Sequence, residues 1–246
     1  TSTNMTGADL TDADLTGADL RNATISSATL VRTILTDADL TSVTGTSAIL
    51  TSVAATGSSL AFANLTGSTL LHGSFAGANM LMAHLDTATI TGTDFTNVTG
   101  SYTTWTSATL WSPNFTGADL TGANFTSATL TTATATGANL TGANLKSTTL
   151  TDLSAVGVTL DGASLVQTSL TGAVLNNASM VGVTGRYASL ADATLSGVDL
   201  TGASLEWSNF DNASAYGATL AGASITYSSF NRTKFEGVDL TGANLT

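Results

Sequence analysis

The sequence lacks cysteine, has a single proline, few charged residues and no long apolar run. Without cysteine, a disulfide framework and any Cys-based metal or redox site are excluded. Charged residues make up 9% of the chain, against roughly 25% in typical soluble globular proteins. No run approaches the ~20 apolar residues of a membrane span. Residues Thr1 to Gly7 contain neither the basic segment nor the apolar segment of a signal peptide. We therefore expect neither an integral membrane protein nor an unprocessed precursor.

What the sequence does have is a five-residue repeat that keeps its phase from Met5 to Leu245. Nearly every fifth residue is large and apolar, and the residue two positions before it is usually alanine or another small residue. This period matches neither the helical period of about 3.6 nor the strand period of about 2, so the chain has to turn every five residues. Most glycines follow the large residue by two positions, as Gly17 does, where a type II turn requires positive φ. Four such corners predict a square coil of about 20 residues.

Units such as TGADL at 116–120 and TGANL at 136–140 and 141–145 resemble the pentapeptide-repeat family, and the match covers essentially the whole chain. The resemblance implies an all-β fold, a right-handed quadrilateral β-helix. In such a fold the large residue and the small one before it both point inward. Stacking at the inter-strand spacing of ~4.8 Å gives about 12 coils and a rod of roughly 58 Å. We predict a single uninterrupted solenoid over residues 1–246.

Exceptions to the repeat support the inward assignment. Glycine takes the large position at Gly45, Gly100 and Gly185, and each time a valine replaces the small residue two positions earlier. Such an exchange of volume is expected in a close-packed interior and has no reason on a surface. Ala135 and Ala215 are alanines at the large position without this compensation, so they predict small voids.

Residues 20 apart are expected to stack on neighbouring coils. This register predicts two ion pairs, Asp12 with Arg32 and Arg186 with Glu206. It also places Asp19 about 4.8 Å from Asp39, which requires a cation or water between them. A calcium ion there would lack most of the roughly six to eight oxygens it prefers. We expect these carboxylates to accept backbone amide hydrogen bonds instead, and we predict no metal site.

The sequence shows no catalytic constellation. The two histidines, His72 and His84, occupy different positions of the square, and no carboxylate lies in the neighbouring rungs of their columns. Asp86 lies two residues beyond His84, which is typical of a solvated surface contact. A nucleophile needs an aligned base, and a solenoid filled with leucine and phenylalanine has no interior cleft for a substrate. We therefore predict a protein that is not an enzyme and needs no cofactor.

Two outward columns interrupt the threonine- and serine-rich coat with large apolar side chains. One column holds Tyr187, Trp207 and Tyr227; the other holds Phe62, Met82 and Tyr102, with Leu81 beside Met82. Aligned apolar patches often mark contacts with partner proteins, so both columns predict lateral interfaces. The alternative is that these side chains merely cover neighbouring backbone.

Two known functions of rod-shaped solenoids are alternatives. Threonine ladders such as Thr131, Thr151 and Thr171 resemble the ice-binding faces of β-solenoid antifreeze proteins, although no face keeps threonine throughout. Some members of the resembled family protect DNA gyrase by imitating the duplex. A net charge of −11 over roughly 58 Å gives about one charge per 5 Å, against one per ~1.7 Å in B-DNA. This charge density is too low for an imitation of the duplex.

The two ends of the repeat favour self-assembly. Solenoids expose unpaired strand edges at their ends and usually need polar caps there. Here the large residues Met5 and Leu10 at one end, and Leu240 and Leu245 at the other, come without a charged cap. We predict a structural protein that joins copies of itself end to end and laterally into a filament or surface lattice. We expect no nucleic-acid partner and no membrane insertion.

Composition also bears on location. The threonine and serine coat, the scarcity of lysine and the lack of cysteine favour an extracellular or cell-surface setting, with the cytoplasm as the alternative.

Overall fold

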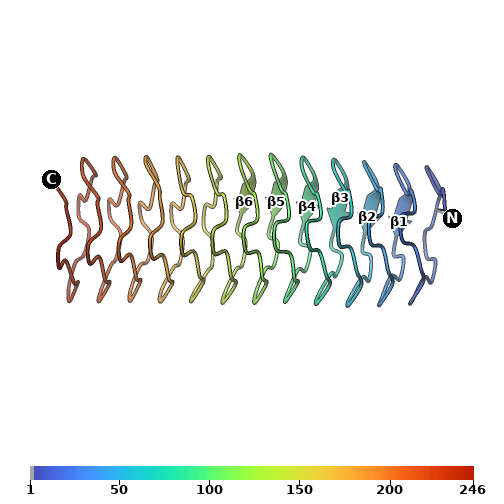
Figure 1. The fold of residues 1–246 in the computed structure, drawn as a ribbon, viewed down its shortest axis with the longest axis horizontal. Helices are drawn as coiled ribbons and strands as arrows, with labels where there is room; N and C mark the ends of the chain where they lie inside the picture. The colour runs from blue at the N-terminus through green and yellow to red at the C-terminus, as the bar shows by residue number, and fades with distance from the viewer. Residues whose placement is uncertain (1–2) are drawn as a thin grey trace.

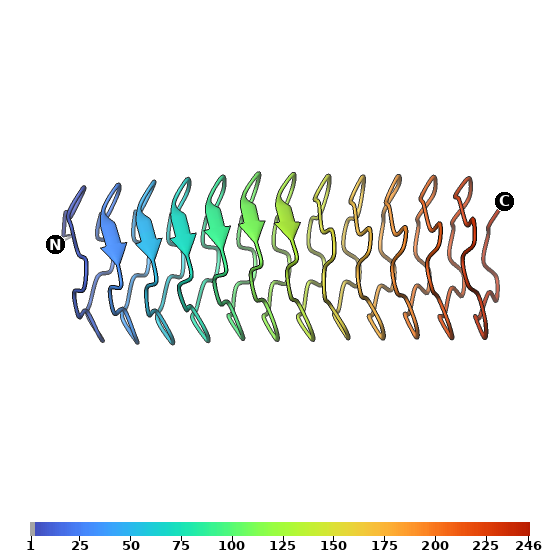
Figure 2. The same cartoon turned by 180° about the vertical axis from the view of Figure 1, so that it is seen from behind.

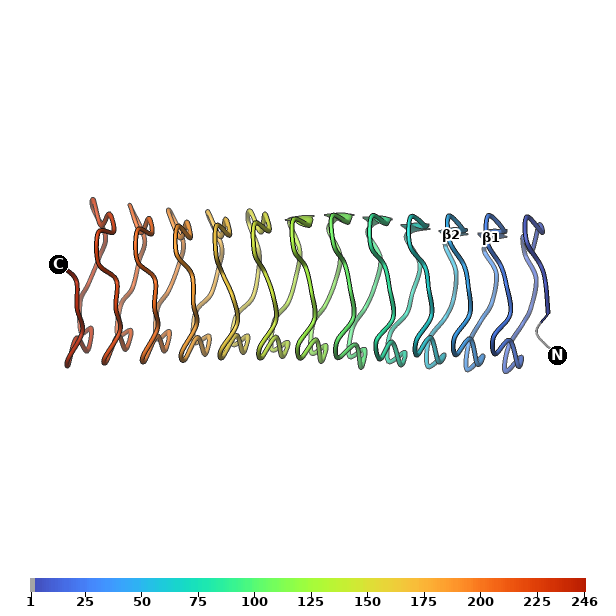
Figure 3. The same ribbon diagram turned by 45° about the horizontal axis from the view of Figure 1, so that its top comes forward.

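A computed structural model describes residues 3–246 as a rod of stacked coils, with the two ends of the chain at opposite ends of the rod (Figure 1). Parallel bridges join residues 20 apart, in twelve successive steps that lead from Asn4 to Asn244. The coils follow one another without interruption when the rod is seen from behind (Figure 2) and with its top turned forward (Figure 3). Residues 3–246 contain no helix that could cross a membrane. The predicted all-β solenoid is confirmed.

A positive φ angle at every fifth residue makes the corners of the coils. From Gly7 to Gly242, the residue two positions after each large one has φ between 49° and 72°. Gly17 has φ 64°, and the next residue, Ala18, donates its N–H to Leu15 O at 3.0 Å, as predicted. This positive-φ position is occupied by more residue types than expected: 20 of its residues are glycine and 28 are not. Most of these others are Ser, Asn or Asp, short polar residues; Asn and Asp in particular tolerate the left-handed region.

Three-residue strands form on one side of the rod, in the N-terminal part of the chain (Figure 2). They are β1 (Thr29–Val31), β2 (Ile49–Thr51), β3 (Thr69–Leu71), β4 (Thr89–Thr91), β5 (Thr109–Trp111) and β6 (Thr129–Thr131). The six strands make one parallel sheet in the order of the chain. Each strand pairs in register with the strand 20 residues later, as Leu30 does with Leu50. The central residue of every strand is buried and its two neighbours face outward, so each rung presents two side chains.

The corner that follows these strands has two forms. At a closed corner the small residue donates its N–H to the large residue three positions earlier, as Ala173 does to Leu170 O at 3.0 Å. In the column of corners that follows these strands, this bond is missing at 30–33, 50–53, 70–73, 90–93, 110–113 and 130–133, which we call open corners. Outside this column, within residues 3–246, it is also missing at 205–208, 225–228 and 235–238. The single proline, Pro113, lies at an open corner, where its missing N–H is not needed. From Leu150 onward the same corner is closed, with Leu153 N–H 3.3 Å from Leu150 O.

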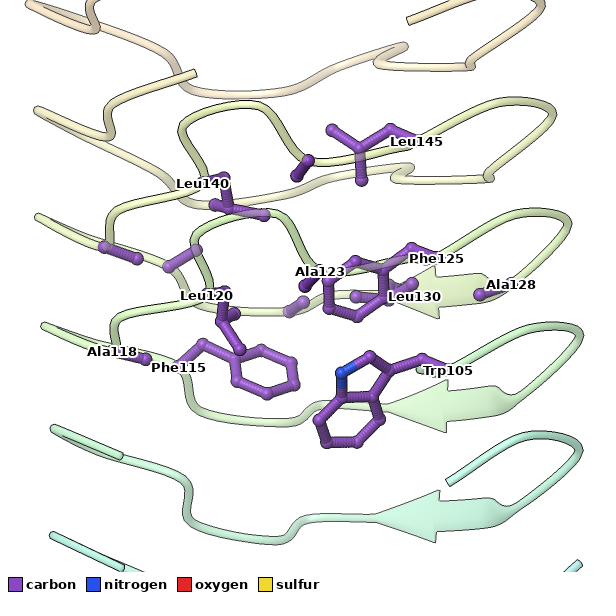
Figure 4. Close-up of a cluster of buried hydrophobic side chains, with 14 of the residues drawn as sticks. Trp105, Phe115, Ala118, Leu120, Ala123, Phe125, Ala128, Leu130, Leu140 and Leu145 are labelled. Carbon is purple, nitrogen blue, oxygen red and sulfur yellow. The ribbon is translucent and has the colours of Figure 1, made fainter. Parts of the chain in front are cut away.

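The large apolar residues fill the interior. Along the coils of β3 to β6 the interior holds an aromatic stack of Phe75, Phe95, Trp105, Phe115 and Phe125. Figure 4 shows the last three of these rings. Stacked rings belong to neighbouring coils, with centroids 5.1 Å apart for Phe95 and Phe115. The buried indole of Trp105 donates its N–H to Thr103 Oγ1 at 2.7 Å, so its polar atom is satisfied. Toward the C-terminus the interior becomes mainly leucine.

The positions where the large residue is missing are filled in two ways or left empty. A Cβ on Gly45 would lie 2.9 Å from Cδ2 of Leu65, so the large residue of the next coil occupies this space. The compensating residue is therefore a column neighbour as well as the valine two positions earlier, Val43, which is also buried. At Ala135 the predicted void is confirmed, because a cavity of about 30 Å³ lies beside this residue.

Candidate interaction surfaces

The side chains of Asp19 and Asp39 accept backbone hydrogen bonds at corners of the solenoid, and both contact an arginine. Asp19 Oδ1 accepts the backbone N–H of Arg21 at 3.2 Å, and Asp39 Oδ1 accepts that of Thr41 at 3.0 Å, so the predicted amide hydrogen bonds are confirmed. The Arg21 side chain lies 2.6 Å from Asp19 and 3.6 Å from Asp39, and it supplies the cation that this pair requires. Its hydrogen bond lowers the pKa of Asp19 to about 2. In the described part of the chain, no three acids and histidines cluster closely enough to hold a metal ion.

Of the two predicted ion pairs, one is confirmed and one is wrong. Arg32 binds Asp12 with two hydrogen bonds of 2.6 Å, which lower the pKa of that carboxyl. The predicted pair of Arg186 with Glu206 is absent from the ion pairs of residues 3–246. The Arg186 guanidinium lies instead 5.0 Å from the ring centre of Tyr187, a cation–π contact. The Glu206 carboxylate accepts hydrogen bonds from the hydroxyls of two serines, Ser204 on its own coil and Ser224 on the next.

His84 belongs to a hydrogen-bond chain that crosses between coils. Its Nδ1 lies 3.0 Å from Thr104 Oγ1, and the same hydroxyl donates to Asp86 Oδ2 at 2.6 Å. Asp86 also accepts the N–H of Thr106 at 2.7 Å. Sequence analysis missed this chain, although the 20-residue register brings Thr104 beside His84. Because Asp86 binds the hydroxyl and not the imidazole, it does not orient His84 as a base, as a catalytic triad requires. His72 lies elsewhere and covers Gly92 of the next coil.

The aromatic column near the C-terminus forms a continuous ladder. Ring centres are 6.3 Å apart for Tyr187 and Trp207 and 4.6 Å apart for Trp207 and Tyr227. All three side chains are exposed, and all three residues have positive φ, of 64°, 60° and 58°. Bulky residues seldom adopt this conformation, so the column carries a backbone cost as well as an exposed apolar surface. We call these three residues the C-terminal ladder.

The second predicted column is less regular. Phe62, Met82 and Tyr102 are exposed and have positive φ, whereas Leu81 is half-buried. The Tyr102 ring lies over the next coil, since a Cβ on Gly122 would be 2.5 Å from its Cε1. This contact supports the alternative, that the ring covers neighbouring backbone.

The two ends of the described rod present different groups. At the C-terminal end, Leu240 is 41% exposed and Leu245 39%, whereas Met5 and Leu10 at the other end are half-buried. Along the rod the N–H of each large residue donates to the following coil, as Leu220 does to Asp239 O at 2.8 Å. Within residues 3–246 the N–H groups of Phe235 and Leu240 have no backbone acceptor, and the carbonyls of Asp9 and Asp14 have no backbone donor. In the same part of the chain the N–H groups of Asp9 and Asp14 also have no backbone acceptor, and the carbonyls of Thr233 and Val238 have no backbone donor. Each end therefore exposes both donors and acceptors, and the two sets are complementary in the way that successive coils are.

The charges near the two ends also differ. The last coil carries the exposed cations Arg232 and Lys234, beside Glu236 and Asp239. The first coil carries four acids, Asp9, Asp12, Asp14 and Asp19, against the single cation Arg21. The C-terminal end is thus the more basic of the two.

Comparison with known proteins places the repeat in a family. The sequence matches the family described as "Pentapeptide repeats" in eight copies, over residues 3–41, 114–152, 156–184, 188–226 and 216–246. No curated protein matches it.

Several solved structures are similar to this chain, and some of them are pentapeptide-repeat proteins. HetL, involved in heterocyst differentiation regulation in the cyanobacterium Nostoc sp. strain PCC 7120, is 23% identical over 98% of this chain and 89% of its own, with a TM-score of 0.40. QnrB1, a plasmid-mediated fluoroquinolone resistance protein, is 18% identical over 74% of this chain and 89% of its own, with a TM-score of 0.40. A protein of the Arabidopsis thaliana thylakoid lumen is 29% identical over 42% of this chain and 67% of its own, with a TM-score of 0.21. The family assignment rests on the sequence match.

Proposed function

The chain belongs to the pentapeptide-repeat family, and from this premise we propose that it is a non-catalytic structural protein whose rods join end to end with copies of themselves. The observation that carries the proposal is the complementarity of the two ends. N–H groups such as those of Phe235 and Leu240 face the carbonyl groups of Asp9 and Asp14 when the rods are placed head to tail. Such a junction continues the parallel hydrogen-bond pattern of the rod and leaves fewer strand edges open.

Burial of apolar side chains supplies the driving force for this junction. Phe235, Leu240 and Leu245 are 36%, 41% and 39% exposed, whereas Leu220 and Ile225, one coil earlier, are 2% and 0% exposed. Fully burying a side chain of this kind stabilises by about 1.5–3 kcal/mol. Because the repeat has a period of five residues, a second rod matches the inward and outward pattern in any of the four rotations about the axis.

Electrostatics orients the junction. Arg232 and Lys234 of one copy come close to the acids of the first coil of the next, whereas two N-terminal ends would bring acids together. Attraction between exposed charges is screened by salt, so the association is expected to weaken as the ionic strength rises.

Lateral contacts would extend filaments into a lattice. The C-terminal ladder is the stronger candidate for such a contact, because its three exposed rings form one stacked surface. The column of Phe62, Met82 and Tyr102 is the second. An extracellular or cell-surface location is part of the proposal, supported by the composition of the coat and by the lack of cysteine.

Sedimentation velocity of the purified full chain tests the junction. We expect the average size to increase with protein concentration and to decrease with added salt. The double variant Arg232→Glu with Lys234→Glu is expected to shift the association to higher concentration, whereas the control Lys146→Glu, an exposed cation in the middle of the rod, leaves it unchanged. A chain that stays monomeric at every concentration, with both termini intact, would contradict the proposal.

One observation favours ice binding as a second candidate function. The outward residues of β1 to β6 are mostly threonine and none is charged, so hydroxyl and methyl groups cover most of this face. Trp111, 61% exposed, stands out of this face. Thermal hysteresis tests this candidate: Trp111→Thr is expected to increase it and Thr89→Lys to abolish it. No hysteresis in the wild type or in Trp111→Thr would rule it out.

A further inference from the structure

A cavity inside the solenoid takes no part in the contacts described above. Its volume is about 30 Å³, and it lies between the aromatic end of the interior at Phe115 and Phe125 and the leucines that follow. Leu140 and Leu145 lie on the C-terminal side of this boundary (Figure 4).

The cavity has a clear origin in the sequence. The column of large residues that contains Phe115 continues with two alanines, Ala135 and Ala155, so a large side chain is missing from two neighbouring coils. Beside Ala155 the small position is enlarged to Leu153, which replaces part of the lost volume. Beside Ala135 the small position is Ala133, and the volume stays empty.

The corner geometry changes at the same place. Ala133 belongs to the last open corner and Leu153 to the first closed one after it, and both side chains line the cavity. The hydrogen bonds between these two coils keep their usual lengths, for example 2.9 Å from Ser154 N–H to Ala133 O, so the backbone holds the coils at a fixed spacing around the cavity.

The chemistry of the lining decides what the cavity can hold. Every lining residue is Phe, Leu, Val or Ala, and no polar atom contributes to the surface. A water molecule needs two to four polar partners, so an apolar cavity of this kind stays dry. The volume of about 30 Å³ exceeds the ~10–15 Å³ that a single water requires, so size does not exclude a small guest. An apolar guest would gain dispersion contacts with lining atoms that now face empty space.

We propose that this cavity is a binding site for one small, uncharged, apolar molecule, with xenon as the probe. The guest replaces the large side chain that coils such as those of Phe115 and Leu175 place in this column and that Ala135 lacks. The proposal is independent of end-to-end association, because the cavity lies in the middle of the chain.

Xenon-129 NMR of the full chain tests the proposal. We expect a saturable change in the xenon chemical shift with the wild-type protein. Ala135→Leu fills the cavity and is expected to abolish the saturable component. Ala191→Leu, which makes the same substitution in an outward position, is the matched control and is expected to keep it. The same xenon response from the wild type and from Ala135→Leu would overturn the proposal, as would the lack of any saturable response.

A second variant and a second measurement guard against an effect of misfolding. Leu140→Ala enlarges the cavity and is expected to add binding of benzene, which the wild-type cavity is too small to accept. Circular dichroism checks that each variant keeps its β-sheet spectrum. Xenon under pressure is expected to raise the melting temperature of the wild type but not that of Ala135→Leu, because a ligand that binds only the folded state stabilises it. Equal shifts in both proteins would contradict a site at Ala135.

Discussion

The same repeat makes two different corners in two halves of the rod. The residue at positive φ is Arg32, Ser52, His72, Gly92, Ser112 or Thr132 at the open corners, and Asp152, Gly172, Asp192, Asn212 or Arg232 at the closed corners beyond β6. Both sets have positive φ, so tolerance of the left-handed region does not separate the two forms of corner. What separates them is the hydrogen bond from the small residue to the large residue three positions earlier.

The difference between the halves reaches the interior and the surface. The open half has the sheet β1 to β6 outside and the aromatic stack inside, whereas the closed half has tight corners outside and mainly leucine inside. The cavity lies at the boundary between them. A uniform repeat can therefore carry regions of different stability and different surface without changing its period.

The largest expected effect is the loss of an interior aromatic ring. Phe95 stacks on Phe75 and Phe115 and meets Trp105 edge-on, so Phe95→Ala is expected to destabilise the chain by about 3–5 kcal/mol. Leu195→Ala, in the same column of the closed half, is expected to cost about 2–5 kcal/mol and less than the phenylalanine change. Urea unfolding followed by circular dichroism measures both. A larger loss for Leu195→Ala would contradict the stabilising role of the aromatic stack.

Proline substitution separates the two kinds of corner directly. Ala173→Pro removes the N–H that closes its corner on Leu170 O and is expected to cost about 1–3 kcal/mol. Ala133→Pro, at an open corner, removes no such bond and is expected to be nearly neutral, because Pro113 already occupies the equivalent position one coil earlier. Thermal unfolding of the two variants compares them. Equal destabilisation would show that the corners do not differ in this hydrogen bond.

The boundary between the halves predicts opposite effects for the same change at two alanines. Ala135→Leu fills the cavity and is expected to stabilise the chain by about 0.5–2 kcal/mol. Ala155→Leu adds volume beside Leu153, which already compensates for the small residue, and is expected to destabilise by about 1–3 kcal/mol. Melting temperatures report the sign. A stabilising Ala155→Leu would mean that the empty volume extends to this coil.

The smallest effect is electrostatic and lies at the N-terminal end. Arg21 lowers the pKa of Asp19 to about 2 in the folded chain, chiefly through its side-chain hydrogen bond. Because the folded pKa is depressed, this contact stabilises the fold above the unfolded pKa of about 4, and its contribution is lost as the pH falls from about 4 toward about 2. NMR titration of the Asp19 carboxyl carbon measures the pKa, and Arg21→Gln is expected to raise it. An unchanged pKa in that variant would exclude Arg21 as the cause.

The fold could be predicted from the sequence because a strict five-residue period with alternating large and small residues has one way to bury its apolar positions. The 20-residue register also predicted the Asp12 and Arg32 pair, and the unfilled volume predicted the void at Ala135. Register alone could not say which neighbour a long side chain selects, and Arg186 lies on an aromatic ring instead of reaching Glu206.

The open corners were also not predicted. Their difference depends on a few degrees of φ and one hydrogen bond at positions that look alike in the repeat. The apolar columns could be located from sequence, because residues 20 apart lie side by side on neighbouring coils.

Electron microscopy of the purified full chain tests the central claim, that the complementary ends join, most directly. A single chain of stacked coils at ~4.8 Å spacing is a rod of roughly 58 Å. The account predicts straight rods several times this length at high protein concentration, and mainly single rods for the double variant Arg232→Glu with Lys234→Glu. Single rods of the wild type at the highest concentration, with both termini intact by mass spectrometry, would contradict it.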